Sequence, residues 1–339
     1  MLYITTRDNK DAYTAFRALH ENTAPDGGGF IPFHTPVFSV SQLEEFVPLS
    51  FGQTVAELLN RFFSCKLTGW DIDICIGRSA VKLATMAHRI VIAEMWHNPE
   101  GVYERVIDNL FAKIVNEKKP TTEWFKVAAH IAILFGIYTE LCRNEIISFG
   151  DTIDFTTMAD DLTIPVAAVY ARKMGLPVDT IIFTCEDNGG LWDLIHLGEL
   201  HYSSKGANLL AYERLVHTAF GCEGVTALCI AINQKKSYRI DDELLPVFNA
   251  GLFCSVTGKA RSAQNINSIY RTNSYLLDPI TAQCIGGLQD YRAKTGESKL
   301  TLMIAGESPM NCISKISEAT GISREKLSSV IEEYRYGGS

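Results

Sequence analysis

The sequence predicts an α/β fold organised around a parallel sheet. Its clearest unit is a strand over 152–157, a helix over 164–174 that ends at Gly175 and Pro177, and a buried strand over 179–185. Glycine just beyond a helix, with proline soon after, is typical of a helix C-terminus. Strand, helix and strand in this order form the unit from which parallel sheets are built. We therefore expect a three-layer parallel-sheet core.

The remaining elements are assigned from hydrophobic periodicity and from turn residues. Further strands are expected over 2–6, 72–76 and 299–304. Further helices are expected over 11–23, within 39–64, and over 77–89, 101–116, 122–142, 278–293 and 311–335. No repeat or low-complexity tract separates these elements, so one body is expected.

Composition excludes several classes of protein. The net charge is −8, and no run of Lys or Arg offers the basic face that a nucleic acid requires. The N-terminus has no signal-peptide pattern, and the longest apolar stretch, 127–138, is too short to span a bilayer. Nine scattered cysteines without metal spacing indicate reduced thiols. We expect a cytoplasmic protein that binds no membrane, nucleic acid or metal.

An ordered series of motifs resembles threonine synthase, a pyridoxal-phosphate (PLP) enzyme of fold type II, the tryptophan-synthase-β group. The matching stretches are MLYITTR, APDGGGFIP, LSFGQTVAELLNRFF, YARKMGLPV, LLDPITAQCIGGLQDY and AGESPMNC. The resemblance implies a small N-terminal α+β domain over 1–90, followed by the large α/β domain over 91–339.

The resemblance also identifies the position of the lysine that forms the Schiff base with PLP. The family carries the pattern F-H-G-P-T-x-x-F-K-D, and WHNPEGVYER matches it position for position. Trp96 and His97 keep its character, and Asn98 replaces its glycine. Glu104 stands where the lysine should be, followed by Arg105 in place of the aspartate. A carboxylate cannot form an imine with an aldehyde.

The loop that holds the PLP phosphate in the family differs as well. The family has a Ser/Thr-Gly-Asn-Phe-Gly type of loop, which aligns with 158–163. Here both glycines are missing, while Asp160 and Asp161 are present. Each carboxylate near a phosphate would be unfavourable by roughly 1–4 kcal/mol. Alternatively, the two aspartates cap the following helix.

Two other family features are changed. The threonine of a T-A-H-P stretch bonds the pyridine nitrogen in the family, and the aligned residues here are Gly306, Glu307 and Ser308. Between Phe111 and Trp124 the chain lacks the S-G-D-T-G loop that grips the substrate carboxylate. The small subdomain that carries this loop therefore looks deleted, and we expect no cofactor, although the family uses PLP.

These departures predict a catalytically inactive relative that acts by binding. The partner would be a second copy, another protein chain, or a small metabolite. Removal of a subdomain should expose a formerly buried surface, and the apolar stretch 125–138 is our candidate for it.

An enzyme with altered chemistry is the rival hypothesis. In one version Lys113 or Lys126 replaces the lost amine. In another, four carboxylates converge as a new acidic site that could transfer protons or hold a cation; these are Glu104, Asp160, Asp161 and Glu307.

Overall fold

The chain folds around a six-stranded sheet in which only one edge strand is antiparallel. The computed structural model describes residues 1–77, 81–204 and 209–336. The strands of the large sheet are β4 (Lys82–Met86), β5 (Ile90–Glu94), β6 (Ile153–Met158), β7 (Val178–Cys185), β10 (Leu252–Val256) and β11 (Thr301–Ala305). Their order is β10-β7-β6-β11-β5-β4, with β4 as the antiparallel strand.

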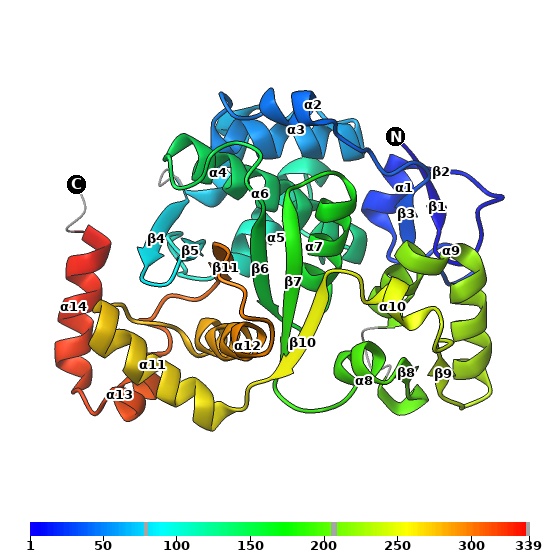
Figure 1. Cartoon of the computed structure of the whole chain (residues 1–339). Coiled ribbons are helices and arrows are strands. Elements are labelled where there is room, and N and C mark those ends of the chain that lie inside the picture. Colours follow the sequence, from blue (N-terminus) through cyan, green and yellow to red (C-terminus); the bar gives the residue numbers. More distant parts are fainter. Residues whose placement is uncertain (78–80, 205–208, 337–339) are drawn as a thin grey trace.

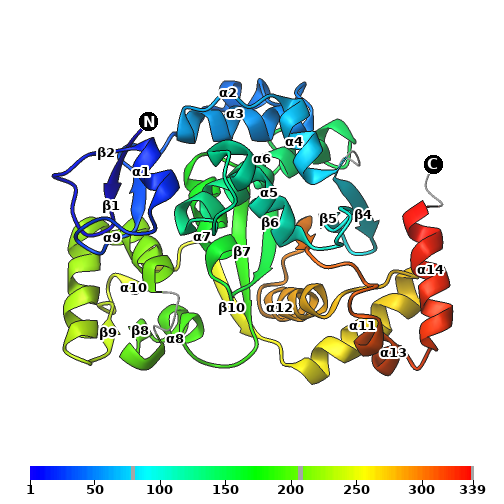
Figure 2. The ribbon, with the colours of Figure 1, turned by 180° about the vertical axis from the view of Figure 1, so that it is seen from behind.

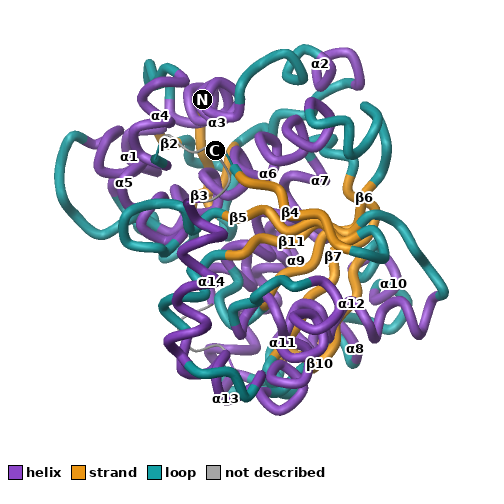
Figure 3. Tube along the Cα trace, turned by 90° about the vertical axis from the view of Figure 1, so that its left-hand side faces the viewer, coloured by secondary structure: helices purple, strands orange, loops and turns teal. Residues whose placement is uncertain are grey.

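Helices cover both faces of this sheet, which gives the predicted three layers (Figures 1 and 3). One face carries α5 (Tyr103–Val115), α6 (Glu123–Arg143) and α7 (Thr163–Lys173), with α3 (Phe51–Phe63) and α4 (Gly69–Ile76) outside them. The other face carries α11 (Lys259–Asn273), α12 (Pro279–Thr295), α13 (Ile313–Thr320) and α14 (Arg324–Tyr336). Two buried hydrophobic clusters correspond to the two faces.

A smaller antiparallel sheet lies at the N-terminus, as Figure 2 shows from behind. It contains β1 (Leu2–Thr5), β2 (Tyr13–Thr14) and β3 (Phe30–Pro32), accompanied by α1 (Ala15–His20) and α2 (Val40–Glu44). Beside it lie α8 (Leu191–His196), β8 (Glu199–Leu200), a 3-10 helix (Tyr202–Ser204), α9 (Leu209–Asn233), β9 (Tyr238–Arg239) and α10 (Leu245–Phe248). The large sheet begins before residue 91, because β4 already belongs to it.

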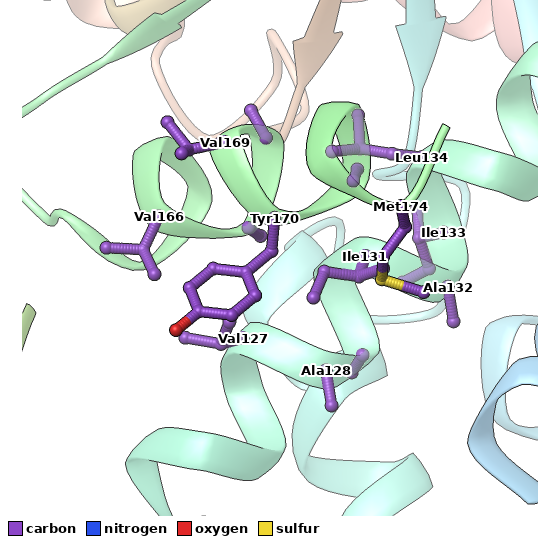
Figure 4. Packing of buried hydrophobic residues seen from close by; sticks show 14 of the residues in the cluster. Val127, Ala128, Ile131, Ala132, Ile133, Leu134, Val166, Val169, Tyr170 and Met174 are labelled. Atoms are coloured by element: carbon purple, nitrogen blue, oxygen red, sulfur yellow. The ribbon is translucent and has the colours of Figure 1, made fainter. Parts of the chain in front are cut away.

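The apolar helix α6 is the centre of the core. It packs between α3 and α7, and Figure 4 shows Val127 and Ile131 of α6 facing Val166 and Tyr170 of α7. Nearly every residue from Trp124 to Leu141 is buried. The prediction that 125–138 forms an exposed interface is therefore wrong, since neighbouring helices of the same chain already cover this surface.

Two predicted elements in the N-terminal region are wrong. The alternating residues 72–76 form part of helix α4, because Thr68 and Asp71 make a capping box that starts a helix at Gly69. The helix predicted over 77–89 is replaced from residue 81 by the β4–β5 hairpin, while its residues 78–80 lie outside the described part. His88 and Arg89 both have positive φ in the turn, which a helix would not allow.

Two helices, α6 and α9, are long and apolar enough to cross a membrane. The apolar window of α6 is 89% buried inside the protein. Helix α9 is broken at Gly221, where φ is 62° and ψ is −160°. Each half is then roughly 18 Å long, well short of the roughly 30 Å of a hydrocarbon core. The burial of α6 inside the protein and the break in α9 are thus features that a continuous membrane span would not have.

A buried charge cluster joins the N-terminal sheet to α9. The carboxylate of Glu213 is fully buried and accepts bonds from Arg7 (2.7 Å) and from the hydroxyl of Thr6 (2.5 Å). Next to it, the guanidinium of Arg214 is also buried, but one of its nitrogens has no hydrogen-bond partner and its bond to the carbonyl of Phe30 is long, at 3.5 Å. Glu213 thus has an ion pair, whereas Arg214 has none among the described residues and lies 5.8 Å from the centre of the Trp124 ring.

This difference leads to a stability prediction. Arg7→Met should lower the free energy of unfolding by about 3 kcal/mol, because it leaves the buried Glu213 carboxylate without its cation. Arg214→Met should leave that free energy unchanged or raise it, because no ion pair is lost. Urea denaturation followed by circular dichroism measures both. A larger loss for Arg214→Met than for Arg7→Met would contradict this account.

Candidate functional site

Two segments far apart in sequence are joined by backbone bonds at the start of α5. The amide of Tyr103 donates to the carbonyl of Gly306 (2.7 Å), and the amide of Ser308 donates to the carbonyl of Gly101 (2.8 Å). An isolated β-bridge pairs Val102 with residue 307. The first turn of α5 therefore lies beside the carboxyl end of β11, which brings the loops that contain Glu104 and Glu307 together.

The loop before α5 is anchored by a buried carboxylate that the sequence did not reveal. Glu94, at the end of β5, accepts a 2.5 Å contact from His97 and hydrogen bonds of 2.7 Å from Tyr275 and Tyr334. Trp96 is fully buried and stacks on His97. A cavity of about 40 Å³ beside these residues has room for a water molecule. Helix α14 is thereby tied to the loop, and no pattern in the sequence indicated this.

Asn98 organises the turn rather than facing a ligand. Its amide nitrogen donates to the carbonyl of Val102 (2.8 Å), and its side-chain oxygen accepts the amides of Glu100 and Val102. The residue is 3% exposed. These bonds hold the chain at Gly101, where φ is +68° and a side chain would meet Ser308. Asn98 is therefore part of the scaffold.

Glu104 itself is exposed at the N-terminal end of α5. It is the acidic residue in the first turn of this helix, where a negative charge is favourable. Arg105 does not neutralise it, because its guanidinium lies 3.7 Å from Glu100 and 3.8 Å from Asp108. The carboxylate thus occupies an accessible position at the carboxyl end of the sheet.

A buried tyrosine–histidine pair lies under this position. The hydroxyl of Tyr103 and Nδ1 of His130 on α6 are 2.8 Å apart. The pKa of His130 is lowered to about 4, mainly by burial; the charge of Asp161 raises this pKa and that of Lys126 lowers it. The imidazole is therefore neutral at pH 7. The charges of Lys126 and Asp161 both act on this imidazole, which contacts Tyr103.

The two aspartates before α7 differ in role. Asp161 accepts bonds from the amide (2.9 Å) and hydroxyl (2.5 Å) of Thr163, the first residue of α7, as a cap would. Burial raises the pKa of Asp160, and the charges of Glu186 and Asp187 raise it as well. A hydrogen bond from the backbone of Glu186 lowers it. Asp160 therefore faces the β7–α8 loop.

Glu307, in the third predicted segment, interacts with Cys312 and Asp278. The side chain of Glu307 hydrogen-bonds to the thiol of Cys312 and raises the pKa of Asp278 through its charge. Burial is the main cause of that pKa, which rises to about 6, while bonds from Thr281 lower it. The sequence showed the start of α12 at Asp278 but not the proximity of this residue to Glu307.

The four carboxylates of the predicted acidic site therefore do not form one cluster. Asp160 interacts with Glu186, Asp161 with Thr163, and Glu307 with Cys312. Across the described ranges 1–77, 81–204 and 209–336, no group of three or more His, Cys, Asp or Glu side chains is arranged to hold a metal. This geometry gives no support to a cation site.

The structure also places the two candidate amines. Lys113 forms a 2.9 Å ion pair with Asp71 of α4, so it points away from Glu104. Lys126 pairs with Glu123 at 3.2 Å and lies one turn before His130. Between Val115 and Glu123 the chain passes directly from α5 to α6, with no inserted subdomain.

The architecture identifies the fold class: a mostly parallel α/β fold like that of PLP fold type II. The chain superimposes on PLP-bound threonine synthase from Brucella melitensis with a TM-score of 0.82 and 16% identity, covering 98% of this chain and 94% of that one. Threonine synthase from yeast gives 0.77 and 15%, with coverage of 96% and 91%.

Within this class the chain is threonine-synthase-like, so the resemblance read from the sequence is confirmed. Residues 2–80 match the family model described as threonine synthase N terminus. Threonine synthase-like 1 from Homo sapiens and from Pongo abelii are each 25% identical over 174 residues, which cover 47% of this chain and 23% of each relative. The chain thus spans about a quarter of the length of these relatives.

The expectation that no cofactor is involved is wrong for this family. The Brucella melitensis neighbour is a PLP-bound threonine synthase, so PLP is the cofactor of this structural relative. The side chains described here do not fit a lysine-linked PLP at the expected position. Residue 104 is a glutamate, and the carboxylate of Asp161 already accepts the amide of Thr163 where the family's loop would offer amides to phosphate.

The buried histidine gives a pH-dependent prediction. His130 has a pKa of about 4 when folded and about 6.5 when unfolded, so the unfolded chain binds more protons between these values. Stability from this group is present above pH 6.5 and is lost as the pH falls toward 4. From pH 7 to pH 5 the loss is about 2 kcal/mol.

His130→Gln should flatten this dependence when urea denaturation is measured at pH 7 and pH 5. The matched control is His20→Gln, since His20 lies outside the core on α1 and should keep the wild-type slope. Equal slopes for wild type and His130→Gln would show that His130 is not held neutral by burial.

Proposed function

We propose that this threonine-synthase-like protein does not form threonine by the family's reaction and acts in the cytoplasm as a binding protein. The observation that carries the proposal is Glu104, exposed at the start of α5 in the position that the resemblance assigns to the Schiff-base lysine. Without an amine at this position, residue 104 cannot make the covalent bond on which the reaction depends. The proposal concerns this bond, and PLP remains the group that the family's fold accommodates.

The surroundings of Glu104 support the proposal. Asp161 is close enough to affect the pKa of His130, which bonds to Tyr103. Asp160 and Asp161 also belong to the segment that aligns with the family's phosphate loop. Each like charge at a distance of a few ångströms opposes phosphate binding by roughly 1–4 kcal/mol.

The bound partner would be a second copy, another protein chain, or a small metabolite. Helix α4 supports an interaction with protein, because Trp70 and Ile74 share one face and are 69% and 54% exposed. Large exposed apolar side chains on one face are common at interfaces. Light scattering after size exclusion would distinguish a monomer from a self-associated form.

A lyase with altered chemistry is the second candidate, and the position of Lys126 favours it. This lysine lies one turn from His130, and His130 contacts Tyr103 next to Glu104. An amine on α6 would then take the place of the lost one. The ion pair of Lys126 with Glu123 opposes this role, because it holds the amine against a carboxylate of its own helix.

Restoring the amine at residue 104 tests the proposal. The Glu104→Lys variant, incubated with PLP and reduced with borohydride, should gain an adduct that peptide mass spectrometry locates at residue 104. The helix N-terminus disfavours a protonated amine there and so favours the reactive neutral form. Wild-type protein should carry no adduct at that position and form no threonine when supplied with PLP and the threonine synthase substrate.

Arg105→Lys is the matched control, because it adds an amine one residue away on a side chain directed toward Glu100 and Asp108. It should gain no comparable adduct. An adduct on Lys126 of the wild type, with threonine formed, would establish the enzyme and overturn the proposal. Equal labelling of Glu104→Lys and Arg105→Lys would show that residue 104 has no special position.

A further inference from the structure

A second cavity lies at the other end of α7, away from Glu104. Its volume is about 270 Å³, and its walls come from α7, β7, α8, α9, α10 and β10. The candidate site lies at the first residue of α7, Thr163, whereas Arg172 and Lys173 in its last turn line the cavity. These two ends are separated by roughly 15 Å along the helix. The cavity is therefore a different place from the one discussed above.

The walls of this cavity are mainly apolar. Phe183, Leu215 and Phe248 are buried residues that line it. Val247 also lines it and is 61% exposed, so the cavity opens to solvent at α10. Apolar walls with a few polar groups are typical of small-molecule sites. The volume corresponds to roughly nine water-sized groups.

The lining contains two cations, Arg172 and Lys173, and the neutral polar residue Thr218. Arg172 donates from Nη1 to the carbonyls of Gly251 (2.7 Å) and Asp179 (3.2 Å) and from Nη2 to the carbonyl of Ala250 (2.8 Å). Lys173 donates to the carbonyl of Thr218 (3.3 Å). In the described part of the chain neither cation forms an ion pair, and no Asp or Glu lines the cavity.

The guanidinium of Arg172 keeps donors for a ligand. A guanidinium has five N–H groups, and three are used by the carbonyls. The Nε hydrogen and one Nη2 hydrogen are not used by these carbonyls, and a guanidinium can donate such hydrogens to the oxygens of a carboxylate. The apolar walls beside Arg172 therefore match an apolar body that carries one carboxylate.

We propose that this cavity binds a small monocarboxylate that has an apolar body and about ten non-hydrogen atoms in total. The carboxylate would pair with Arg172 and be attracted by Lys173, while the apolar body contacts Phe183, Leu215 and Phe248. This inference goes beyond the proposed function and does not rest on it, since it involves neither Glu104 nor PLP. It would hold even if the PLP adduct experiment revealed an enzyme.

Isothermal titration of the full-length protein with octanoate and with 1-octanol tests the charge and the cavity separately. Octanoate should bind one to one, at least tenfold more tightly than the neutral alcohol. Arg172→Gln should weaken octanoate binding at least tenfold and remove the preference over octanol. Lys236→Gln, at an exposed position outside the lining, should bind as the wild type does.

Two further variants locate the binding. Ala219→Phe fills the cavity and should abolish binding of both compounds. Val247→Glu places a negative charge at the exposed mouth and should weaken octanoate at least fivefold while leaving octanol unchanged; because residue 247 is exposed, this variant is expected to fold. Equal affinity for octanoate and octanol, undiminished binding in Val247→Glu, or no detectable binding by wild type at millimolar octanoate would each overturn the proposal.

Discussion

The backbone pairing of residues 101–103 with 306–308 fixes the geometry on which the candidate site depends. Its bonds involve only main-chain atoms of Gly101, Tyr103, Gly306 and Ser308, so they are indifferent to side-chain chemistry. Gly101 is required because its φ is +68° and a Cβ there would lie 3.0 Å from Ser308. Residue 104 follows directly on α5. Its position is therefore set by the backbone and not by its own side chain.

Helix N-termini explain why acidic residues are well tolerated at these positions. A helix N-terminus attracts negative charge, which is why such ends commonly bind phosphate. In this chain the protein's own carboxylates take that role, since Glu104 lies in the first turn of α5 and Asp161 bonds the first amide of α7. Both carboxylates therefore stabilise the helices at whose starts they lie.

Much of the fold could be predicted because its signals are local. The β6–α7–β7 unit, α5, α6, α12 and β11 follow from hydrophobic periodicity, and the structure confirms them within a few residues. The failures at 72–76 and 77–89 have local causes, since a capping box outweighed an alternating pattern and two residues of positive φ made a hairpin. The bonds of Glu94 to Tyr275 and Tyr334 could not be predicted, because they join residues more than 180 positions apart.

The predicted interface on α6 is wrong because other helices of the same chain cover the apolar residues of α6. Length and apolarity of a helix show that it must be covered, but they do not show what covers it. Here α3 and α7 of the same chain cover α6, as Figure 4 shows for α7. With the direct connection from α5 to α6, the apolar residues of α6 are therefore not exposed. Binding to a partner must use other surfaces. Helix α7 separates two such places, with carboxylates at its first turn and unpaired cations at its last. Because these ends have opposite charge, the carboxylate that we propose for the cavity would be attracted at the last turn of α7 and repelled at its first.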